Sequence, residues 1–340
     1  MTSDDAVALA AEAGLHYVET GAPGMQRVRR GRGFSYVRSD GTSADRRARQ
    51  WIESLAIPPA WQDVWISNDR LGHILATGVD QAGRKQYVYH PDWVAIRDEV
   101  KFDRLADFGD GLTDLRRGLD RALRQPGLTR EKVAALAVAI LDRTLIRVGN
   151  RRYADENESY GLTTLTCDHI EVNGSHVHLE FAGKGGADVE IVFKDRRLSS
   201  LVRRCQELEG QTLFSYPADG GTLEPLTSTD VNNYLATAMG GPFTAKDFRT
   251  WGASSLVLRE LANAQDDDPK AVIAAVDAAA DHLGNTRAVC RDSYVHPAIF
   301  DAHRNGSLEE AWRSSRTGKW LSRSESALRR LIGADRFAGP

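Results

Sequence analysis

The spacing of apolar residues divides the chain into a strand-rich first part and a mostly helical remainder. From Phe34 to His90, short apolar runs alternate with turn residues, a pattern typical of β-strands. The runs are Phe34–Val37, Val64–Ile66 and His73–Thr77. One helix, Arg46–Leu55, is predicted among them and ends before Pro58. After Pro91 the apolar residues follow helical spacing, so we expect a domain boundary near residues 91–100.

Two helices are predicted in the segment that follows. The first, Thr113–Gln125, carries apolar residues on one face and ends at a Pro-Gly pair. The second starts after Thr129, a typical N-cap residue, and its apolar stripe continues to Gly149. Because Arg143 and Arg147 are four residues apart, they would share one side of that helix.

Between residues 162 and 194 the apolar pattern changes to a period of two. Two glycine-containing turns, at residues 173–174 and 183–186, separate three apolar stretches. The stretches are Ile170–Val172, Val177–Phe181 and Val189–Phe193. We therefore expect a three-stranded antiparallel sheet with Lys184 at the tip of its second hairpin. Helical patterns resume from Leu198.

These regions together predict an α+β protein with two domains. Residues 1–95 would form a small β-rich N-terminal domain, and residues 96–340 a mostly helical domain that carries the three-stranded sheet. A length of 340 residues with 41% hydrophobic and 27% charged residues suits one large or two moderate globular domains. After Gly306, apolar residues among arginines predict one or two helices that pack on the second domain.

Composition excludes several classes of protein. The cysteines, Cys167, Cys205 and Cys290, are widely spaced without a CxxC pair, which argues against a disulfide framework or a zinc ribbon and fits a reducing cytosol. No apolar run approaches the roughly 18 residues of a membrane span. The N-terminus also lacks a basic segment followed by an apolar one. We therefore expect a cytoplasmic protein.

The net charge of −3 and the pI of about 6.3 argue weakly against a nucleic-acid partner. Only a local group of basic residues could outweigh this bulk value. The segment Gly24–Gly33 holds four arginines within six residues. On its own, this segment is interpreted as a solvent-exposed loop, and contact with phosphate is the alternative.

Four residues are candidates for catalysis because the pattern of apolar packing does not account for them. They are Arg147 at a predicted helix end, Lys184 on the glycine-flanked hairpin, Arg249 in the segment Lys246–Gly252, and Tyr294 on a predicted helix. Taken singly, each has an ordinary interpretation as a helix cap, a solubilising charge or a packed aromatic residue.

In this order and spacing the four residues resemble the active site of type IB DNA topoisomerases, the poxvirus-like group with bacterial members. The matching stretches in the second part are Ile146–Gly149, Tyr160–Leu165, His169–Glu171, Phe181–Lys184, Lys246–Gly252 and Gly284–Tyr294. Those in the first part are Ile57–Trp61, Val64–Trp65, Gly72–His73, Ala76–Gly78 and Gly83–Tyr89. The resemblance covers roughly residues 25–300, and its motifs are specific in combination.

The resemblance implies that Tyr294 is the nucleophile in cleavage of a phosphodiester. A phenolate suits this reaction because, with a pKa of about 10, it can attack and later leave. Arg147 and Arg249 would stabilise the non-bridging oxygens of the transition state, and Lys184 would protonate the departing 5′ oxygen. The sequence shows no metal-type carboxylate cluster and no GxxxxGK[ST] motif, so we expect neither a metal nor a nucleotide cofactor.

One position departs from the family pattern. The family's fifth site residue is a histidine that donates to a non-bridging oxygen, and the matching position, nine residues before Tyr294, is Asn285. Asparagine donates a neutral hydrogen bond but cannot become cationic. We therefore keep Asn285 among the catalytic residues and expect weaker stabilisation from it. His282, three residues earlier, is interpreted as a surface residue.

Five further residues match positions that contact DNA in the family: Gln86, Tyr87, Tyr89, Tyr153 and Lys246. The first three match contacts from the major-groove side, where glutamine can pair with a base edge and tyrosine hydroxyls can reach phosphate. The alternative is an ordinary edge strand on which Tyr87 and Tyr89 face a core.

The function implied is relaxation of supercoiled double-stranded DNA without ATP or metal. It would proceed through a 3′-phosphotyrosyl intermediate, strand rotation and religation. In the family the two lobes form a clamp around duplex DNA. We further expect a monomer that associates with the nucleoid and needs no cofactor.

Two alternatives remain. A tyrosine recombinase or integrase uses the same chemistry, but its arginine normally belongs to a His-x-x-Arg box, where this chain has Lys246, and its N-terminal half is helical. The other alternative is a duplex-DNA-binding protein without catalysis. The complete set of Arg147, Lys184, Arg249 and Tyr294 argues against it.

Overall fold

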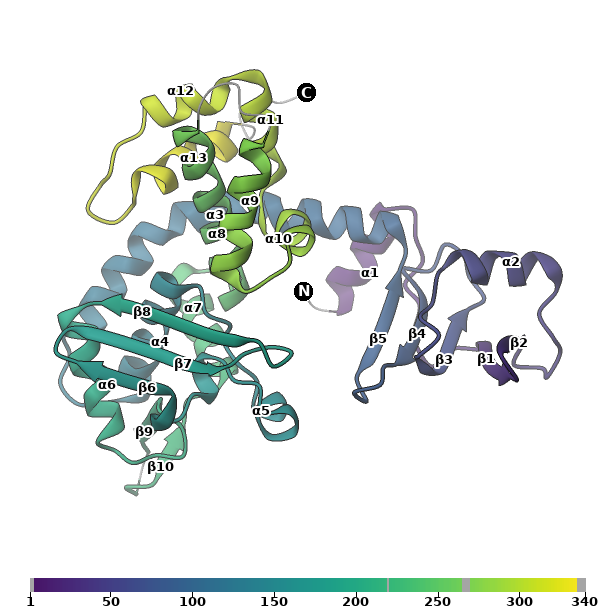
Figure 1. The fold of residues 1–340 in the computed structure, drawn as a ribbon, viewed down its shortest axis with the longest axis horizontal. Coiled ribbons are helices and arrows are strands. Elements are labelled where there is room, and N and C mark those ends of the chain that lie inside the picture. Colours follow the sequence, from purple (N-terminus) through teal and green to yellow (C-terminus); the bar gives the residue numbers. More distant parts are fainter. Residues whose placement is uncertain (1–2, 219, 265–269, 335–340) are drawn as a thin grey trace. The chain divides into compact units, whose positions relative to one another are not determined.

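The computed structural model describes residues 3–218, 220–264 and 270–334. Contacts divide the chain into two compact units, Met1–Phe102 and Asp103–Pro340. The boundary falls inside α3, a 32-residue helix from Pro91 to Ala122 (Figure 1). The assignment of two functional domains to residues 1–95 and 96–340 stays a prediction.

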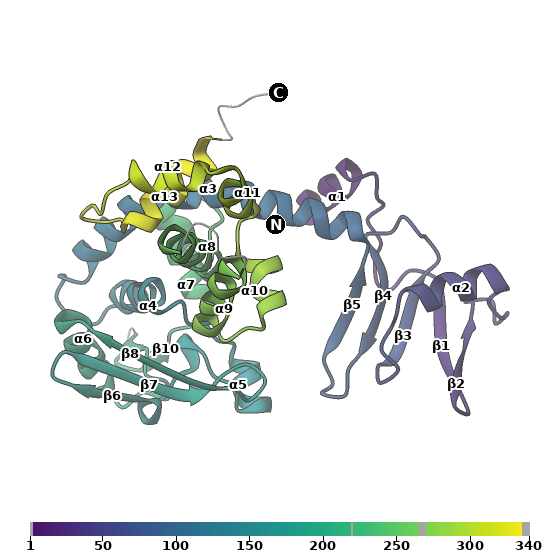
Figure 2. The ribbon, with the colours of Figure 1, turned by 45° about the horizontal axis from the view of Figure 1, so that its top comes forward.

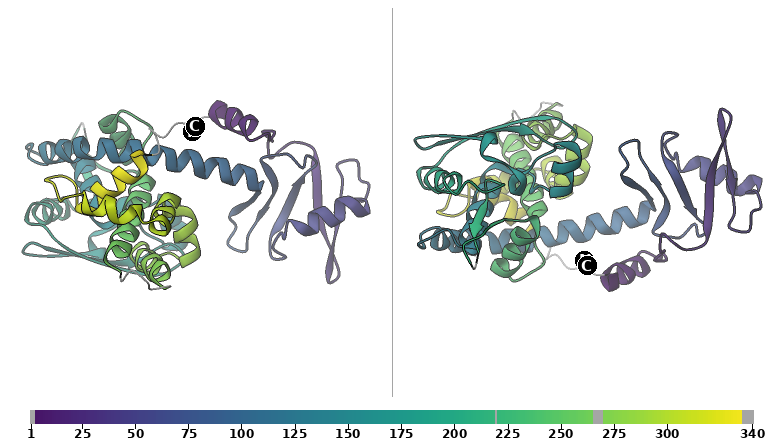
Figure 3. Two further views of the ribbon diagram at one scale, coloured as in Figure 1. Left: turned by 90° about the horizontal axis from the view of Figure 1, so that it is seen from above. Right: turned by 90° about the horizontal axis from the view of Figure 1, so that it is seen from below.

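The first unit is built on a five-stranded antiparallel sheet (Figure 3). The strand order in this sheet is β2-β1-β3-β4-β5. Its elements are α1 (Ser3–Glu12), β1 (Gly24–Arg30), β2 (Gly33–Val37), α2 (Arg46–Ser54), β3 (Gln62–Ser67), β4 (Ile74–Val79) and β5 (Lys85–Tyr89). Helix α2 begins where Asp45 caps the main-chain N–H of Ala48. Its buried Ile52 packs with Met25 and Ile66 of the sheet in one core cluster. The predicted β-rich first part is thus confirmed.

The basic segment near residue 24 is a strand, so its interpretation as a loop was wrong. Residues Gly24–Arg30 form β1, which pairs with both β2 and β3, and Met25 is buried. The guanidinium of Arg27 donates to the carbonyls of Ile57, Pro58 and Trp61. This arginine therefore holds a loop of the unit in place.

The second unit is mostly helical and carries the predicted three-stranded sheet, in the order β6-β7-β8 (Figure 2). Besides α3, its helices are α4 (Arg130–Thr144), α5 (Arg151–Asn157), α6 (Arg196–Gln206), α7 (Ser228–Met239), α8 (Ala245–Asn263), α9 (Ala271–Leu283), α10 (Arg287–Tyr294), α11 (Pro297–Asn305), α12 (Ser307–Arg313) and α13 (Arg323–Ala334). Its strands are β6 (Ile170–Asn173), β7 (His176–Ala182), β8 (Asp188–Lys194) and the short pair β9 (Ser215–Pro217) and β10 (Leu223–Pro225). The α+β class is confirmed.

Helix α8 lies at the centre of the second unit, in contact with α4, α7, α9, α10 and α13 (Figure 2). It is buried along most of its length, and Trp251 is among the largest fully buried side chains. The start of α8 is fixed by Asp247, whose carboxylate accepts from the main-chain N–H of Thr244 and from Arg104.

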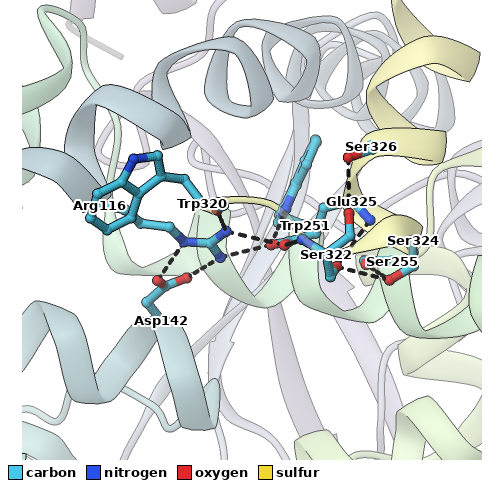
Figure 4. Close-up of polar contacts among 9 residues, drawn as sticks. All are labelled: Arg116, Asp142, Trp251, Ser255, Trp320, Ser322, Ser324, Glu325 and Ser326. Atoms are coloured by element: carbon cyan, nitrogen blue, oxygen red, sulfur yellow. Dashed lines mark hydrogen bonds and ion pairs between the residues drawn. The ribbon is translucent and has the colours of Figure 1, made fainter. Parts of the chain in front are cut away.

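The tail after Gly306 forms two helices, α12 and α13, as predicted. Glu325 of α13 accepts from the indole N–H of Trp251 (3.1 Å) and from Arg116 (2.7 Å), which also binds Asp142 (Figure 4). Trp251 and Glu325 are buried, Arg116 and Asp142 are half-buried, and this network connects the tail to α3, α4 and α8.

Two helices differ from their predicted lengths. Helix α3 starts at Pro91, so the predicted Thr113–Gln125 helix is only its last part. Helix α4 starts after the N-cap Thr129, as predicted, but ends at Thr144 rather than near Gly149. Leu145 takes the left-handed conformation (φ 55°) and packs on Gly252 of α8, where a Cβ would lie 2.2 Å from the leucine side chain. Arg147 therefore lies beyond the helix and does not share a face with Arg143.

None of the helices in the described part of the chain combines the length and apolar character that crossing a bilayer requires.

Candidate active site

Arg147 belongs to a segment whose main chain is held by the segment that follows α5. Its carbonyl accepts from the N–H of Leu162 (2.8 Å), and the carbonyl of Val148 accepts from Thr163 (2.8 Å). The two segments approach so closely that a Cβ on Gly161 would lie 2.6 Å from the Arg147 carbonyl oxygen. This pairing, rather than a helix, sets the position of the Arg147 side chain.

Arg249 is almost completely buried on α8, with 5% of its surface exposed. Its guanidinium donates to the carbonyls of Leu145 (2.6 Å) and Leu283 (2.9 Å), just beyond the end of α4 and at the end of α9. Its Nε is buried and has no hydrogen-bond partner among the described residues. Burial and the nearby Arg147 lower the pKa of Arg249. A buried cation with an unused donor is suited to bind an anion.

Tyr294 is the last residue of α10, and its ring lies beside Arg249. The guanidinium carbon is 5.2 Å from the ring centroid. Burial acts to raise the pKa of Tyr294, but Arg249, Arg147 and Lys246 together outweigh it, and the pKa is lowered. By contrast, burial raises the pKa of Tyr234 to about 12. The surroundings of Tyr294 therefore favour its phenolate.

Asn285 lies between two helices at the edge of this group. Gly284 ends α9 in the left-handed conformation, and the N–H of Asn285 returns to the carbonyl of Ala280 (2.9 Å). The side-chain oxygen Oδ1 accepts from Arg147 (2.6 Å). Because a guanidinium only donates, this contact directs the amide nitrogen Nδ2 away from Arg147. Nδ2 is buried and unpaired among the described residues, so it is a donor available to a bound oxygen.

Lys184 lies at the tip of the β7–β8 hairpin, where Gly185 and Gly186 both have positive φ (78° and 75°). It is exposed, and among the described residues it has no hydrogen bond or ion pair. A pocket of about 170 Å³ is lined by Lys184, Arg147, Arg249 and the residues 281–284. Tyr294 and Asn285 join this group through their contacts with the two arginines. The structure thus brings the five predicted catalytic residues together.

His282 also lines this pocket, although it is an exposed residue as expected. Partial desolvation of the ring where it faces the pocket, together with the charges of Arg249 and Arg259, lowers the pKa of His282. Sequence reasoning placed it on the surface and missed its place at the pocket. Lys246, on the first turn of α8, is exposed and acts electrostatically on Tyr294.

The predicted DNA contacts of the first unit lie on β5, an edge strand. Tyr87 is 40% exposed and stacks on Tyr89, with ring centroids 5.6 Å apart. Tyr89 is half-buried and packs against the cluster around Trp93. The alternative of two core-facing tyrosines therefore fits Tyr89 better than Tyr87. Because side chains alternate along a strand, Gln86 lies on the opposite face, where it donates to Asp80 (2.9 Å).

Tyr153 is a further predicted DNA contact, and Arg84 is a basic residue of the matching stretch Gly83–Tyr89. Tyr153 belongs to α5, and its side chain lies outside the described part of the structure. Arg84 is paired with Asp80, an interaction that lowers the pKa of this carboxyl to about 2. Arg84 is thus partly neutralised within the first unit.

Known proteins are similar to this chain over most of its length. The family model of the "Eukaryotic DNA topoisomerase I, catalytic core" matches residues 90–313, and that of the "Bacterial DNA topoisomerase IB, N-terminal domain" matches residues 33–80. DNA topoisomerase 1B of Acanthamoeba polyphaga mimivirus is 31% identical over 276 residues, which cover 75% of this chain and 82% of the relative. DNA topoisomerase 1B of vaccinia virus (strain Copenhagen) is 23% identical over 296 residues, covering 82% and 90%. DNA topoisomerase 1 of Mycosarcoma maydis is 29% identical over 175 residues, covering 46% and 17%.

Proposed function

The chain belongs to the type IB DNA topoisomerase family and is therefore an isomerase that acts on DNA, and from this premise we propose that it relaxes supercoils through a covalent tyrosine intermediate. The observation that carries the proposal is the contact of Arg249 with Tyr294 in a site that also holds Arg147 and Asn285. A phenolate beside two guanidinium groups has both the nucleophile and the oxyanion stabilisers that phosphoryl transfer needs.

In the cleavage step, Tyr294 loses its proton to solvent and the phenolate attacks the phosphorus of one DNA strand. The bond from phosphorus to the 5′ oxygen breaks, and Lys184 gives that oxygen a proton. The strand is left joined to Tyr294 through its 3′ phosphate, with a free 5′ hydroxyl on the other side. After rotation, the 5′ hydroxyl attacks the phosphotyrosine, the same proton returns to Lys184, and the phenolate leaves. The phosphotyrosine conserves the bond energy, so the cycle needs neither ATP nor metal.

Binding of DNA is consistent with the slightly acidic chain. The net charge of −3 is a sum over all residues, whereas phosphate binding depends on the charges at one surface. Arg147, Lys184 and Arg249 line one pocket, and Lys246 is close enough to act on Tyr294. We propose that these cations hold the scissile phosphate and that Gln86, Tyr87, Tyr89 and Tyr153 contact the duplex elsewhere.

A plasmid relaxation assay with EDTA and without ATP tests the function. Relaxed topoisomers are expected under these conditions. A tyrosine recombinase would instead join two different DNA molecules, and a protein without catalysis would shift the plasmid in a gel without changing its linking number. Either of those results would contradict the proposal.

Replacing Lys184 with alanine is expected to slow cleavage severely on ordinary DNA and much less on DNA with a 5′-phosphorothiolate at the cleavage site. A sulfur leaving group has a low pKa and departs without a proton, so a general acid is no longer needed. Single-turnover cleavage of both substrates measures the difference. Lys194→Ala, an exposed lysine at the far end of β8, is the matched control and should cleave both at the parent rate. Equal slowing of Lys184→Ala on the two substrates would show that Lys184 acts by charge alone.

Replacing Asn285 with alanine is expected to raise the cleavage barrier by about 0.5–1.5 kcal/mol in a solvated site, and by more in a site without water. The variant loses the free amide donor and the acceptor that holds Arg147. Asn285→Asp keeps that acceptor but replaces the donor with a negative charge, so it should be slower than the alanine variant. Asn285→His can both accept and donate, and should retain activity with a new pH dependence near neutrality.

Single-turnover cleavage between pH 5 and 9 compares the three variants with the parent. Parent rates for both Asn285→Ala and Asn285→Asp would remove Asn285 from the site.

A further inference from the structure

Ser254 is a buried residue that contacts the main chain around Tyr294. It lies on α8 five residues after Arg249, and none of its surface is exposed. Its hydroxyl donates to the carbonyl oxygen of Tyr294 (3.2 Å) and accepts from the main-chain N–H of His296 (2.9 Å). One side chain thus holds the backbone on both sides of Val295.

These two hydrogen bonds satisfy groups that a helix end leaves open. Helix α10 ends at Tyr294, and Val295 is extended (φ −105°, ψ 126°). The Tyr294 carbonyl therefore has no N–H one turn later within its own helix. Because the Ser254 hydroxyl can accept and donate at once, it occupies the place of the missing helical partners.

Helix α10, which ends at Tyr294, is short and mostly exposed, and it packs against α8 and α9. It is eight residues long, and Cys290 is its one buried residue in the described structure. Val295, directly after it, is buried with 1% of its surface exposed. Val295 and the hydroxyl of Ser254 therefore both hold the main chain at the end of α10.

Helix α8 carries both Ser254 and Arg249, so one rigid helix positions both residues that contact Tyr294. Five residues along a helix correspond to a rise of about 7.5 Å. Arg249 contacts the ring of Tyr294 and Ser254 contacts its carbonyl. Helix α8 is itself anchored at its start by Asp247 and in its middle by the contact of Trp251 with Glu325 (Figure 4).

We propose that Ser254 is a positioning residue for the nucleophile, which fixes the main chain of Tyr294 so that its hydroxyl stays in line with the scissile phosphate beside Arg249. The proposal rests on the proposed function, in which Tyr294 attacks DNA. A displacement of a reacting group by about 1 Å can slow a reaction by roughly 100-fold. Ser254 therefore affects the rate of cleavage without touching DNA.

The test compares Ser254→Ala with Ser255→Ala in the full-length protein. Ser255 is the neighbouring buried serine of α8, but its hydroxyl binds Ser324 of α13 at 2.9 Å (Figure 4). Single-turnover cleavage at saturating protein gives both the rate and the final amount of adduct. For Ser254→Ala we expect a cleavage rate about 10- to 100-fold lower than that of the parent. The religation rate should fall by the same factor. The final amount of adduct and the affinity for DNA should equal those of the parent. Ser255→Ala should cleave at the parent rate, and Ser254→Cys, with a weaker hydrogen-bonding group, should lie between parent and Ser254→Ala.

Several outcomes would overturn the proposal. A parent rate for Ser254→Ala would show that the hydroxyl does not position Tyr294. A lower amount of adduct at an unchanged rate, together with a lower melting temperature in both alanine variants, would show a role in folding only. Failure of the proposed function is recognised separately, because the parent protein would then form no adduct at all.

Discussion

Tyr294→Phe is expected to abolish covalent attachment to DNA while duplex binding is retained. The phenylalanine ring keeps the shape of the tyrosine and its contact with the Arg249 guanidinium, 5.2 Å from the ring centroid. Only the hydroxyl is lost, and that oxygen is the atom that forms the bond to phosphorus. Because the remaining cations of the pocket stay in place, the affinity for phosphate should change little.

Trapping on denaturing gels, with labelled DNA and the Tyr294→Phe protein, measures this loss directly. Tyr234→Phe is the matched control, since Tyr234 is also partly buried but its pKa is raised to about 12 by burial. The control should form adduct like the parent. An adduct with Tyr294→Phe, or its loss with Tyr234→Phe, would assign the nucleophile to another residue.

Arg147→Ala and Arg249→Ala are each expected to raise the cleavage barrier by about 3–5 kcal/mol, which is a rate loss of roughly 10²- to 10⁴-fold. Loss of a neutral oxyanion donor costs about 2.7–4 kcal/mol, and a charged donor is worth more. Lysine at either position should recover only part of the rate, because an ammonium group cannot fork to two oxygens. Single-turnover cleavage gives the rates, and Arg259→Ala, an exposed arginine of α8, should match the parent.

The pH dependence separates this catalytic effect from a loss of folding. Arg249 is the first of the charges that lower the pKa of Tyr294, against the opposing effect of burial. Without Arg249, burial dominates, the pKa of Tyr294 rises, and less phenolate is present near neutral pH. The cleavage rate of Arg249→Ala should therefore keep rising with pH in a range where that of the parent has levelled off. A uniform loss at every pH, accompanied by a lower melting temperature, would point instead to the carbonyls of Leu145 and Leu283 that Arg249 holds.

Local patterns in the sequence predicted the elements that depend on local interactions. The three-stranded sheet follows from its alternation and its glycine turns, and the start of α4 follows from the N-cap Thr129. The end of α4 could not be predicted, because the apolar stripe continues past Thr144 while a contact between Leu145 and Gly252 imposes the left-handed turn. Likewise, the basic run near Arg27 looked like a loop because arginines and glycines outnumber apolar residues in it, although it pairs with the adjacent β2 and with β3.

The sequence predicted which residues form the candidate site, but it could not predict the contacts between them. The motifs indicated Arg147, Arg249 and Asn285 as separate donors. The structure adds that Asn285 accepts from Arg147 and so presents its amide nitrogen, and that Arg249 binds two main-chain carbonyls. Ser254 was missed because a serine inside a buried helix carries no signal until the end of α10 lies against it.

The central claim is that Tyr294 forms a covalent bond to the 3′ phosphate of a cleaved strand. It is tested most directly by trapping the parent protein on duplex DNA labelled at one end or the other, followed by protease digestion and mass spectrometry of the peptide that retains nucleotide. The account predicts that label 5′ of the break stays with the protein, that the other strand end carries a free 5′ hydroxyl, and that the modified residue is Tyr294. Attachment through a 5′ phosphate, attachment to any other residue, or cleavage without a protein adduct would contradict it.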